Sequence, residues 1–261
     1  MIISIANQKG GVAKTTTTVN LGAGLALRGR SVLLIDADPQ ASLTRYLGVA
    51  TDGFTLGDWL LDRADFNAVC RPSGFDRLSV VPASERLISD QSMIEQDRFK
   101  GFAFLAQKIA DIRSRFDVIL IDTMPTFSTL LANSLFAADR VLIPVRLDSM
   151  SLSVLPLLLP KIVDVQKHNP RLQILGILAT FYEAALNESA RSLADLERHA
   201  PHLVMSTKIR KNTKLAEAVA YKKPIQHYDL NSLGAADYEA LTDEVANKCH
   251  ITIPSTEVAP I

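Results

Sequence analysis

Short apolar runs alternate along the chain with longer segments in which apolar residues recur every three or four positions. The short runs predict strands at Ile2–Ala6, Ser31–Ile35, Leu78–Val81, Val118–Ile121, Val141–Val145 and Ile174–Ala179. The longer segments predict helices at Thr16–Leu27, Phe102–Arg115, Leu152–His168, Glu188–His199, Lys214–Ala220 and Ala235–Lys248. Continuously apolar strands are typical of parallel sheets that are covered on both faces. The order therefore predicts an α/β fold with a doubly wound, mostly parallel sheet, helices on both faces, and ligands at the carboxyl ends of the strands.

No linker rich in Pro, Gly and Ser divides the chain, so we expect residues 1–252 to form a single domain. The tail at 253–261, which contains Pro254 and Pro260, is expected to be frayed. The least regular stretch is 48–76. Its cluster of Leu56, Trp59, Leu60 and Leu61 predicts a small helix packed on the surface.

Composition narrows the class of protein. Of the 261 residues 48% are apolar, enough for a sizeable core, and the formal net charge is zero. Affinity for nucleic acid would therefore need a local basic patch. Cys70 and Cys249 are far apart and lack metal-ligand spacing, which indicates a reducing compartment. Without a basic-then-apolar leader or an apolar run of membrane-spanning length, we expect a cytoplasmic protein with no membrane partner.

The first strand leads directly into a glycine-rich turn, Asn-Gln-Lys-Gly-Gly-Val-Ala-Lys-Thr-Thr, and then into a helical pattern. Glycines let backbone N–H groups curl around a phosphate. Lys14 supplies a positive charge for the β- and γ-phosphates, and Thr15 can ligate Mg²⁺. The strict P-loop pattern would have glycine where Gln8 and Ala13 stand. A Gly-Gly turn with incidental lysines is the alternative, which the order of strand, turn, Lys-Thr and helix disfavours.

Two further strands end in aspartate. The predicted strand Ser31–Ile35 is followed by Asp36-Ala37-Asp38-Pro39-Gln40, and the predicted strand Val118–Ile121 is followed by Asp122. In a parallel sheet these carboxylates would lie beside the phosphate loop, where they can orient water or the water shell of a metal. An Asp-Pro turn and a helix-capping carboxylate are the simpler alternatives for each taken alone. Together with the loop, the aspartates favour metal-assisted chemistry on a nucleoside triphosphate.

These motifs resemble the ParA/MinD family of deviant Walker ATPases, and the resemblance covers nearly the whole chain. The matching segments are 7–17, 36–40, 119–123, 211–218 and 228–235. The likeness is closest to the small ParA proteins of the Soj type, in which the catalytic domain begins at the first residue. The resemblance implies a P-loop ATPase with ATP and Mg²⁺ as cofactors. It further implies an ATP-dependent homodimer that binds non-specific DNA and partitions or positions a plasmid, a chromosome region or a protein cargo.

The resemblance also implies a ParB-like or cargo-adaptor partner that stimulates slow hydrolysis, and a cytoplasmic, nucleoid-associated location. Lys9 corresponds to the signature lysine that reaches the partner subunit's phosphates, Lys14 to the P-loop lysine, and Asp38 to the carboxylate that positions the attacking water. Thr15 and Asp122 would hold Mg²⁺. The phosphates would be wrapped by Gly10, Gly11, Val12, Ala13, Lys14, Thr15 and Thr16. The adenine pocket would be formed by Thr180, Arg210 and Asn212.

The chain departs from the family pattern in places. Ala13 replaces a glycine beside the P-loop lysine, and its methyl group would crowd the backbone near the β-phosphate, so reduced affinity or turnover is expected. Glu183-Ala184-Ala185-Leu186 stands where relatives often carry Asp-x-Arg-Thr, and Arg210 occupies the place of a proline.

A basic stretch occupies residues 208–223, where the single acid is Glu217. A solvated charged face is the simpler interpretation of such a run. The family uses this region of its ATP-bound dimer for sequence-independent DNA binding. The resemblance therefore favours a DNA interface formed by Arg198, Lys208, Lys211, Lys214, Lys222 and Lys223.

Three other classes of protein share parts of this pattern. A MinD-like membrane-cycling ATPase would need an amphipathic basic helix at the C-terminus, which residues 249–254 do not supply. An iron–sulfur ATPase would need paired cysteines. A P-loop metabolic enzyme would need a substrate pocket, which the sequence alone does not exclude.

Overall fold

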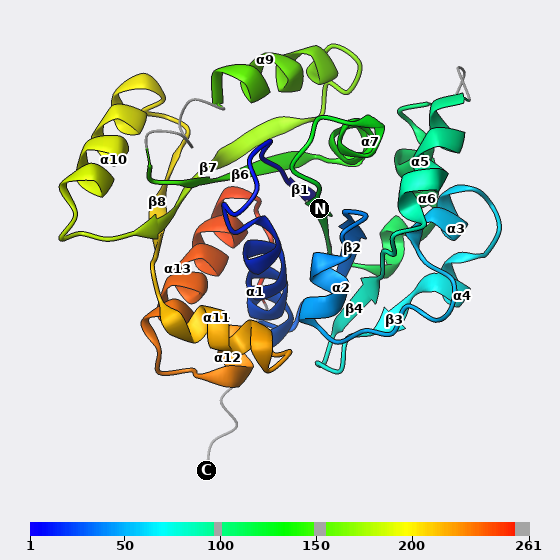
Figure 1. The fold of residues 1–261 in the computed structure, drawn as a ribbon, viewed down its shortest axis with the longest axis horizontal. Coiled ribbons are helices and arrows are strands. Elements are labelled where there is room, and N and C mark those ends of the chain that lie inside the picture. Colours follow the sequence, from blue (N-terminus) through cyan, green and yellow to red (C-terminus); the bar gives the residue numbers. More distant parts are fainter. Residues whose placement is uncertain (97–100, 149–154, 254–261) are drawn as a thin grey trace.

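The computed structural model describes residues 1–96, 101–148 and 155–253, whose strands form one eight-stranded sheet with helices on both faces (Figure 1). The strand order is β3-β4-β2-β5-β1-β6-β7-β8, and all neighbours are parallel except the antiparallel pair β3–β4. The strands are β1 (Ile2–Ile5), β2 (Val32–Ala37), β3 (Arg71–Pro72), β4 (Leu78–Val81), β5 (Val118–Thr123), β6 (Arg140–Arg146), β7 (Gln173–Tyr182) and β8 (Val204–Arg210). The predicted fold class is confirmed.

The helices connect these strands. They are α1 (Lys14–Leu27), α2 (Ser42–Tyr46), α3 (Leu56–Leu60), α4 (Phe66–Val69), α5 (Leu87–Gln96), α6 (Phe104–Ile112), α7 (Thr129–Ala137), α9 (Leu155–Gln166), α10 (Asn187–His199), α11 (Thr213–Ala220), α12 (Ile225–Tyr228) and α13 (Leu233–Lys248), with a 3₁₀ turn η1 (Arg113–Arg115). The six predicted helices are present. Residues 152–154, where one was expected to begin, lie outside the described residues, as do residues 254–261 of the expected frayed tail.

Two strands were not predicted. β8 lies at one edge of the sheet, where Met205 and Ile209 are buried and the polar residues between them are exposed or half-buried. An edge strand needs fewer apolar positions than a central one, so the apolar run is broken there. β3 is only two residues long and ends in Pro72, which cannot donate to a ladder and suits the opposite edge.

The central strands β1, β2 and β5 are apolar at most positions because both faces of the sheet are covered, and their polar residues are Ser4, Asp36, Asp122 and Thr123. In β2, Leu33 and Ile35 belong to one core cluster, whereas Val32 and Leu34 belong to the other. All four side chains are fully buried. Successive side chains of β2 therefore point into two different apolar layers. Because neither face of the strand is polar, its two-residue repeat is not visible in the sequence.

The predicted small helix in 48–76 is present as α3, but its expected place on the surface is wrong. Trp59 is 3% exposed and packs against the ring of Phe66, with 5.2 Å between the ring centroids. Both belong to the larger core cluster. A five-residue helix carries too little periodicity to distinguish a buried face from an exposed one.

The sheet brings the sequence motifs together at the carboxyl ends of its central strands. β1 lies between β5 and β6, and its last residue, Ile5, is opposite Asp122. β2 follows on the other side of β5, with Asp36 opposite Asp122. The carboxyl ends of β1, β2 and β5 therefore converge, as a doubly wound sheet requires for a ligand site. Over the described ranges no helix is long and apolar enough to span a membrane.

Gly24→Ala tests the close packing of α1 on α13. A methyl group at this position would overlap Oγ1 of Thr242, which is fully buried and donates to the carbonyl of Tyr238 at 2.7 Å. Overpacking should lower the free energy of unfolding by about 1–3 kcal/mol, although alanine has the higher helix propensity. Urea unfolding followed by circular dichroism measures the change.

Leu27→Ala is the matched control, because Leu27 lies in the same helix and is 57% exposed. Its effect should stay within about 0.5 kcal/mol. A Gly24→Ala protein as stable as the wild type would contradict the packing.

Candidate functional site

The loop between β1 and α1 is fixed to the sheet by Asn7. The side-chain amide of this buried residue donates to the carbonyl of Pro144 on β6 at 2.7 Å, and its oxygen accepts from the backbone N–H of Lys9 at 2.9 Å. Gly10 and Gly11 follow, both exposed, and a Cβ at either position would meet no atom within 4 Å. The glycines therefore leave the backbone open for a close ligand. Sequence reasoning did not single out Asn7 as the anchor of this turn.

Ala13 adopts the left-handed conformation, with φ 67° and ψ 30°, and stands directly before α1. Its carbonyl accepts the backbone N–H of Thr17 at 2.9 Å, so the residue still closes the first turn of the helix. For an L-residue with a Cβ this conformation costs roughly 1–2 kcal/mol. The alanine that departs from the family pattern is therefore also strained.

Lys14 is the buried cation of the loop. Its side chain reaches back to the loop, and Nζ donates to the carbonyl of Lys9 at 3.1 Å. Lys14 is 7% exposed. Burial lowers the pKa of Lys14, and the carboxylates of Asp122 and Asp38 oppose that shift. The ammonium group of Lys14 is thus held in a position where it could bind a phosphate.

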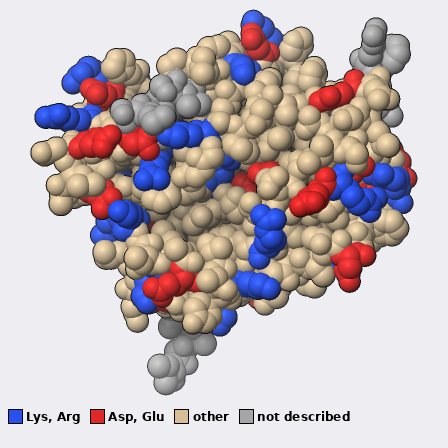
Figure 2. All heavy atoms as spheres, viewed as in Figure 1, with Lys and Arg blue, Asp and Glu red and all other residues tan. Residues whose placement is uncertain are grey.

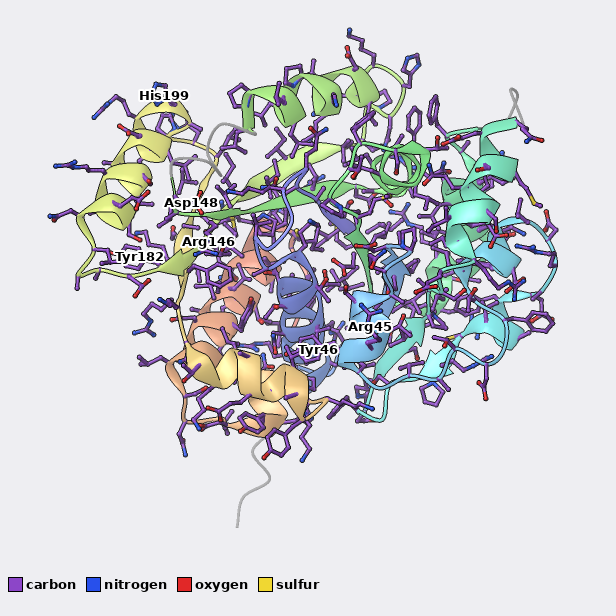
Figure 3. All side chains as sticks on the ribbon, viewed as in Figure 1. Arg45, Tyr46, Arg146, Asp148, Tyr182 and His199 are labelled. Carbon is purple, nitrogen blue, oxygen red and sulfur yellow. The ribbon has the colours of Figure 1, made fainter. Side chains whose placement is uncertain are left out.

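Lys9 turns the other way. Its Nζ lies 3.1 Å from Oδ1 of Asp148, and the other carboxylate oxygen lies 3.2 Å from Nε of Arg146. Arg146 and Asp148 lie together at the end of β6 (Figure 3). The guanidinium of Arg146 also covers the ring of Phe181 at 4.9 Å. The two lysines of one loop therefore occupy different sides of it.

Asp122 is the centre of the predicted metal site. Oγ1 of Thr15 donates to Oδ2 at 2.7 Å, and Oγ1 of Thr18 donates to Oδ1 at 3.3 Å. Burial, followed by repulsion from Asp36, raises the pKa of Asp122 to about 8. Burial also raises the pKa of Asp36 to about 6, which hydrogen bonds from Thr44 oppose.

This excess of buried negative charge fits a divalent cation held by Asp122 and Thr15. Among the described residues no three His, Cys, Asp or Glu side chains form a metal cage. Mg²⁺ is usually held by one or two protein oxygens together with water and substrate phosphates, and Asp122 and Thr15 would supply such oxygens.

Asp38 follows β2 and is 8% exposed. Its Oδ1 accepts the backbone N–H of Gln40 at 2.9 Å, and its own N–H donates to Oδ1 of Asp36 at 3.2 Å. A carboxylate fixed in this way at the wall of the cleft can orient a water molecule.

Two cavities adjoin the loop. The larger, about 560 Å³, is lined by Gly10, Gly11, Ala13, Lys14, Thr15, Thr16, Asp38, Gln40, Ser42, Arg45, Tyr46, Pro125, Phe181 and Val219. The smaller, about 340 Å³, is lined by Ala13, Thr16, Thr180, Phe181, Ile209, Arg210, Lys211, Asn212, Leu215, Ala216, Val219 and Tyr238. Ala13, Thr16, Phe181 and Val219 line both, so the cavities adjoin along a shared wall.

The three residues expected at the adenine pocket all line the smaller cavity. Thr180 is fully buried, and its Oγ1 donates to the carbonyl of Val12 at 3.3 Å. The guanidinium of Arg210 pairs with Asp237 at 2.5 Å, and the side-chain oxygen of Asn212 caps α11 by accepting the N–H of Lys214 at 2.8 Å. Sequence reasoning did not single out two further lining residues: Phe181, which directly follows Thr180 on β7, and Tyr238 on α13.

The six residues of the expected DNA interface do not form one patch. Lys211 pairs with Glu183 at 3.1 Å, and Lys214 with Glu217 at 2.8 Å. Lys222 and Lys223 follow α11 and are exposed, and Lys208 lies on β8. Positive and negative side chains are interspersed over the face in view (Figure 2).

Arg198 is separate from this group. It lies in the last turn of α10, before β8 begins, whereas Lys211 follows the end of that strand. Seven strand residues separate the two ends by roughly 20 Å.

The comparisons with known proteins agree with this geometry. A family model described as an AAA domain matches residues 1–174. The chromosome-partitioning ATPase Soj of Treponema pallidum (strain Nichols) is 38% identical over 242 residues, which cover 92% of this chain and 94% of Soj. The chromosome partitioning protein ParA of Caulobacter vibrioides (strain NA1000 / CB15N) is 34% identical over 252 residues, which cover 95% of this chain and 94% of that protein. The chain belongs to the ParA/Soj family of partitioning ATPases.

A solved structure supports the same placement. Cobyrinic acid a,c-diamide synthase from Mycobacterium smegmatis is 31% identical, with a TM-score of 0.80, and the match covers 93% of this chain and 92% of that one. It has been solved with bound ADP and magnesium and with a bound ATP analog and magnesium. The predicted family and its P-loop ATPase class are confirmed. The two predicted cofactors, ATP and Mg²⁺, correspond to the ligands of that similar structure.

Ala13→Gly should stabilise the nucleotide-free protein by about 1 kcal/mol, because glycine adopts the left-handed conformation without a Cβ penalty. Urea unfolding in the absence of nucleotide measures the gain. Ala190→Gly, at an exposed position of α10, is the control and should lose about 0.5–1 kcal/mol. A loss of stability at both positions would contradict the strain at Ala13.

Proposed function

We propose that this chain is an ATP-driven molecular switch that partitions or positions a cargo on DNA. It binds ATP with Mg²⁺, dimerises, binds DNA without sequence preference, and leaves the DNA when a ParB-like or cargo-adaptor partner stimulates hydrolysis. Its location is cytoplasmic and nucleoid-associated. The observation that carries this proposal is the opposed direction of the two loop lysines: Lys14 is buried within its own site, whereas Lys9 pairs with Asp148 outside it, 28% exposed.

The proposed nucleotide spans both cavities. The triphosphate lies along the larger one, against Gly10, Gly11 and Lys14, and the base enters the smaller one. Ile209, Leu215 and Val219 give that smaller cavity an apolar lining that suits a purine ring. Mg²⁺ would be held by Thr15 and Asp122 and would neutralise charge on the phosphates.

In the proposed hydrolysis, Asp38 orients the attacking water and accepts a hydrogen bond from it. The carboxylate lies at the wall of the larger cavity, opposite the loop that would hold the γ-phosphate. Lys14 stabilises the charge that develops on the transferred phosphoryl group. Lys9 of one subunit would reach the phosphates of the other, so hydrolysis and dimer release are linked.

The proposed DNA contact uses the basic residues on α11 and next to its two ends. Exposed ion pairs contribute at most about 1 kcal/mol, so the pairs of Lys211 and Lys214 can open to phosphate. One such surface is weak, because acidic side chains lie among the basic ones. Two joined surfaces in a dimer gain effective concentration, which makes DNA binding depend on ATP.

A metabolic P-loop enzyme is the second candidate function, because the similar Mycobacterium smegmatis protein is named as a synthase. Such an enzyme would bind a second small substrate beside the nucleotide. It would not need DNA or an ATP-dependent dimer, so the two experiments below separate the candidates.

Lys9→Ala should abolish the ATP-dependent dimer while leaving ATP binding within a few-fold of wild type, because Lys14 supplies the charge within the site. Light scattering with a non-hydrolysable ATP analogue reports the dimer, and calorimetry reports binding. Asp38→Ala is the matched control: it should bind ATP and dimerise but not hydrolyse. A dimer that persists in Lys9→Ala would exclude the cross-subunit role.

With ATP, the protein should bind two unrelated DNA duplexes equally, and log K should fall linearly with log salt. Lys211→Ala and Lys214→Ala should each reduce that slope by roughly 0.9 for every phosphate that the lysine neutralises. Fluorescence anisotropy over a salt series measures both. Lys167→Ala, at an exposed lysine just after α9, is the control and should change nothing. Equal binding with ATP, with ADP and without nucleotide would count against the switch.

A further inference from the structure

The short helix α2 is fixed on both sides of one residue, Arg45. The fully buried Thr44 donates through Oγ1 to Asp36 on β2 at 2.7 Å, and its Oγ1 also accepts the N–H of Ala83 at 3.0 Å. Tyr46, 3% exposed, accepts at its hydroxyl a hydrogen bond from Asn20 of α1 at 3.4 Å. The backbone at Arg45 is therefore held by anchors on the sheet and on α1.

Between these anchors, the side chain of Arg45 is exposed and lines the larger cavity. It makes no hydrogen bond or ion pair with any residue in 1–96, 101–148 or 155–253. Arg45 and Tyr46 lie on α2 beside α1 (Figure 3). A guanidinium on a fixed backbone, with its donors uncommitted, is suited to an anionic ligand.

Arg45 gives the lining of the larger cavity a net positive charge. Its charged lining residues are Lys14, Asp38 and Arg45. Asp38 offsets one of the two positive charges, so Arg45 adds a second cation to the one that Lys14 supplies for a polyphosphate. Lys14 belongs to the phosphate loop, whereas Arg45 comes from the segment after β2. A ligand in the cavity would thus meet cations from two separate segments.

The hydrogen bonds also indicate which phosphates Arg45 faces. The side-chain amide of Asn20 that bonds Tyr46 also donates to the carbonyl of Thr16 at 2.7 Å. Thr16 lines both cavities and therefore marks the junction between the phosphates and the base. Asp38 lines only the larger cavity. Through Asn20, α2 is thus tied to this junction, in addition to its anchor on Asp36 of β2.

We propose that Arg45 is a further nucleotide-binding residue, which clamps the α- and β-phosphates from the wall opposite the phosphate loop. The inference rests on the proposed ATP site and adds to it a cation that the P-loop motif does not contain. Because the contact is with phosphates that ATP and ADP share, Arg45 stabilises both bound states. It raises affinity for nucleotide without acting on the bond that breaks.

The test compares Arg45→Ala, Arg45→Lys and wild type by isothermal titration calorimetry with three probes: Mg²⁺–ADP, Mg²⁺ with a non-hydrolysable ATP analogue, and adenosine. Arg45→Ala should weaken both nucleotides by a similar factor, about ten-fold, as is usual when one charge-assisted hydrogen bond is removed. Adenosine binding should not change. Arg45→Lys should recover part of the affinity, because the charge is kept and the planar fork is not.

Arg171→Ala is the matched control. Arg171 is exposed, has no ion pair among the described residues, and precedes β7 at the amino end of the strands, away from the cavity. Its nucleotide affinity and unfolding midpoint should equal those of wild type. The unfolding midpoint of Arg45→Ala should also be unchanged without nucleotide, which excludes an effect through misfolding.

Three results would overturn the inference. Nucleotide affinities of Arg45→Ala within two-fold of wild type would show that Arg45 does not contact the nucleotide. Weaker binding of the ATP analogue but not of ADP would show that Arg45 contacts the γ-phosphate and not the α- and β-phosphates. Unchanged nucleotide affinity with weakened DNA binding would make it a DNA contact. If wild type itself bound neither nucleotide, the proposed ATP site would fail, which is a separate outcome from all three.

Discussion

Asp36 and Asp122 are register partners on neighbouring parallel strands, and both are fully buried, so two carboxylates share one poorly solvated pocket at the end of the sheet. Burial raises the pKa of both residues, and repulsion from Asp36 adds to the shift at Asp122. The remaining parts of the site are placed around this pair. Lys14 lies close enough to lower the pKa of Asp122, and Thr15 and Thr18 donate to its oxygens.

The same pair is where the proposed site would hold a cation. A divalent ion with a polyphosphate would compensate charge that Lys14 and the two threonines compensate only in part. Asp36 itself is committed to Thr44 and to the N–H of Asp38, so it orders the segment after β2 instead of facing the ligand. One buried carboxylate would thus hold the metal ion of the proposed site, and its partner fixes the segment that carries Asp38 and leads to Arg45.

Strained backbone conformations occur at residues that line the proposed nucleotide site. Ala13 is left-handed at the start of α1, and Phe181 has a φ of 53° at the wall shared by both cavities. Such residues persist only where the surroundings hold them. Asn7 holds the loop against β6, and the guanidinium of Arg146 covers the Phe181 ring. The rigid sheet therefore supports an unfavourable but preorganised loop geometry.

The sequence by itself determined the α/β fold class, the six central strands and the position of the phosphate loop, because continuous apolar runs and a glycine-rich turn depend on local chemistry. It also placed Asp38 and Asp122 at strand ends, since a parallel sheet brings those ends to one edge. The buried α3 and the edge strand β8 were decided only by the tertiary structure, because burial depends on what packs over a segment.

The same is true of the cavity walls. Phe181, Tyr238 and Arg45 lie far apart in sequence and carry no motif, and Arg45 reaches the cleft because Thr44 and Tyr46 are fixed to β2 and α1. Arg198 is adjacent to the basic stretch in sequence, yet the length of β8 separates it in space. Motifs record which chemistry a chain can perform, whereas the direction of each side chain depends on contacts between residues distant in sequence, which only the fold supplies.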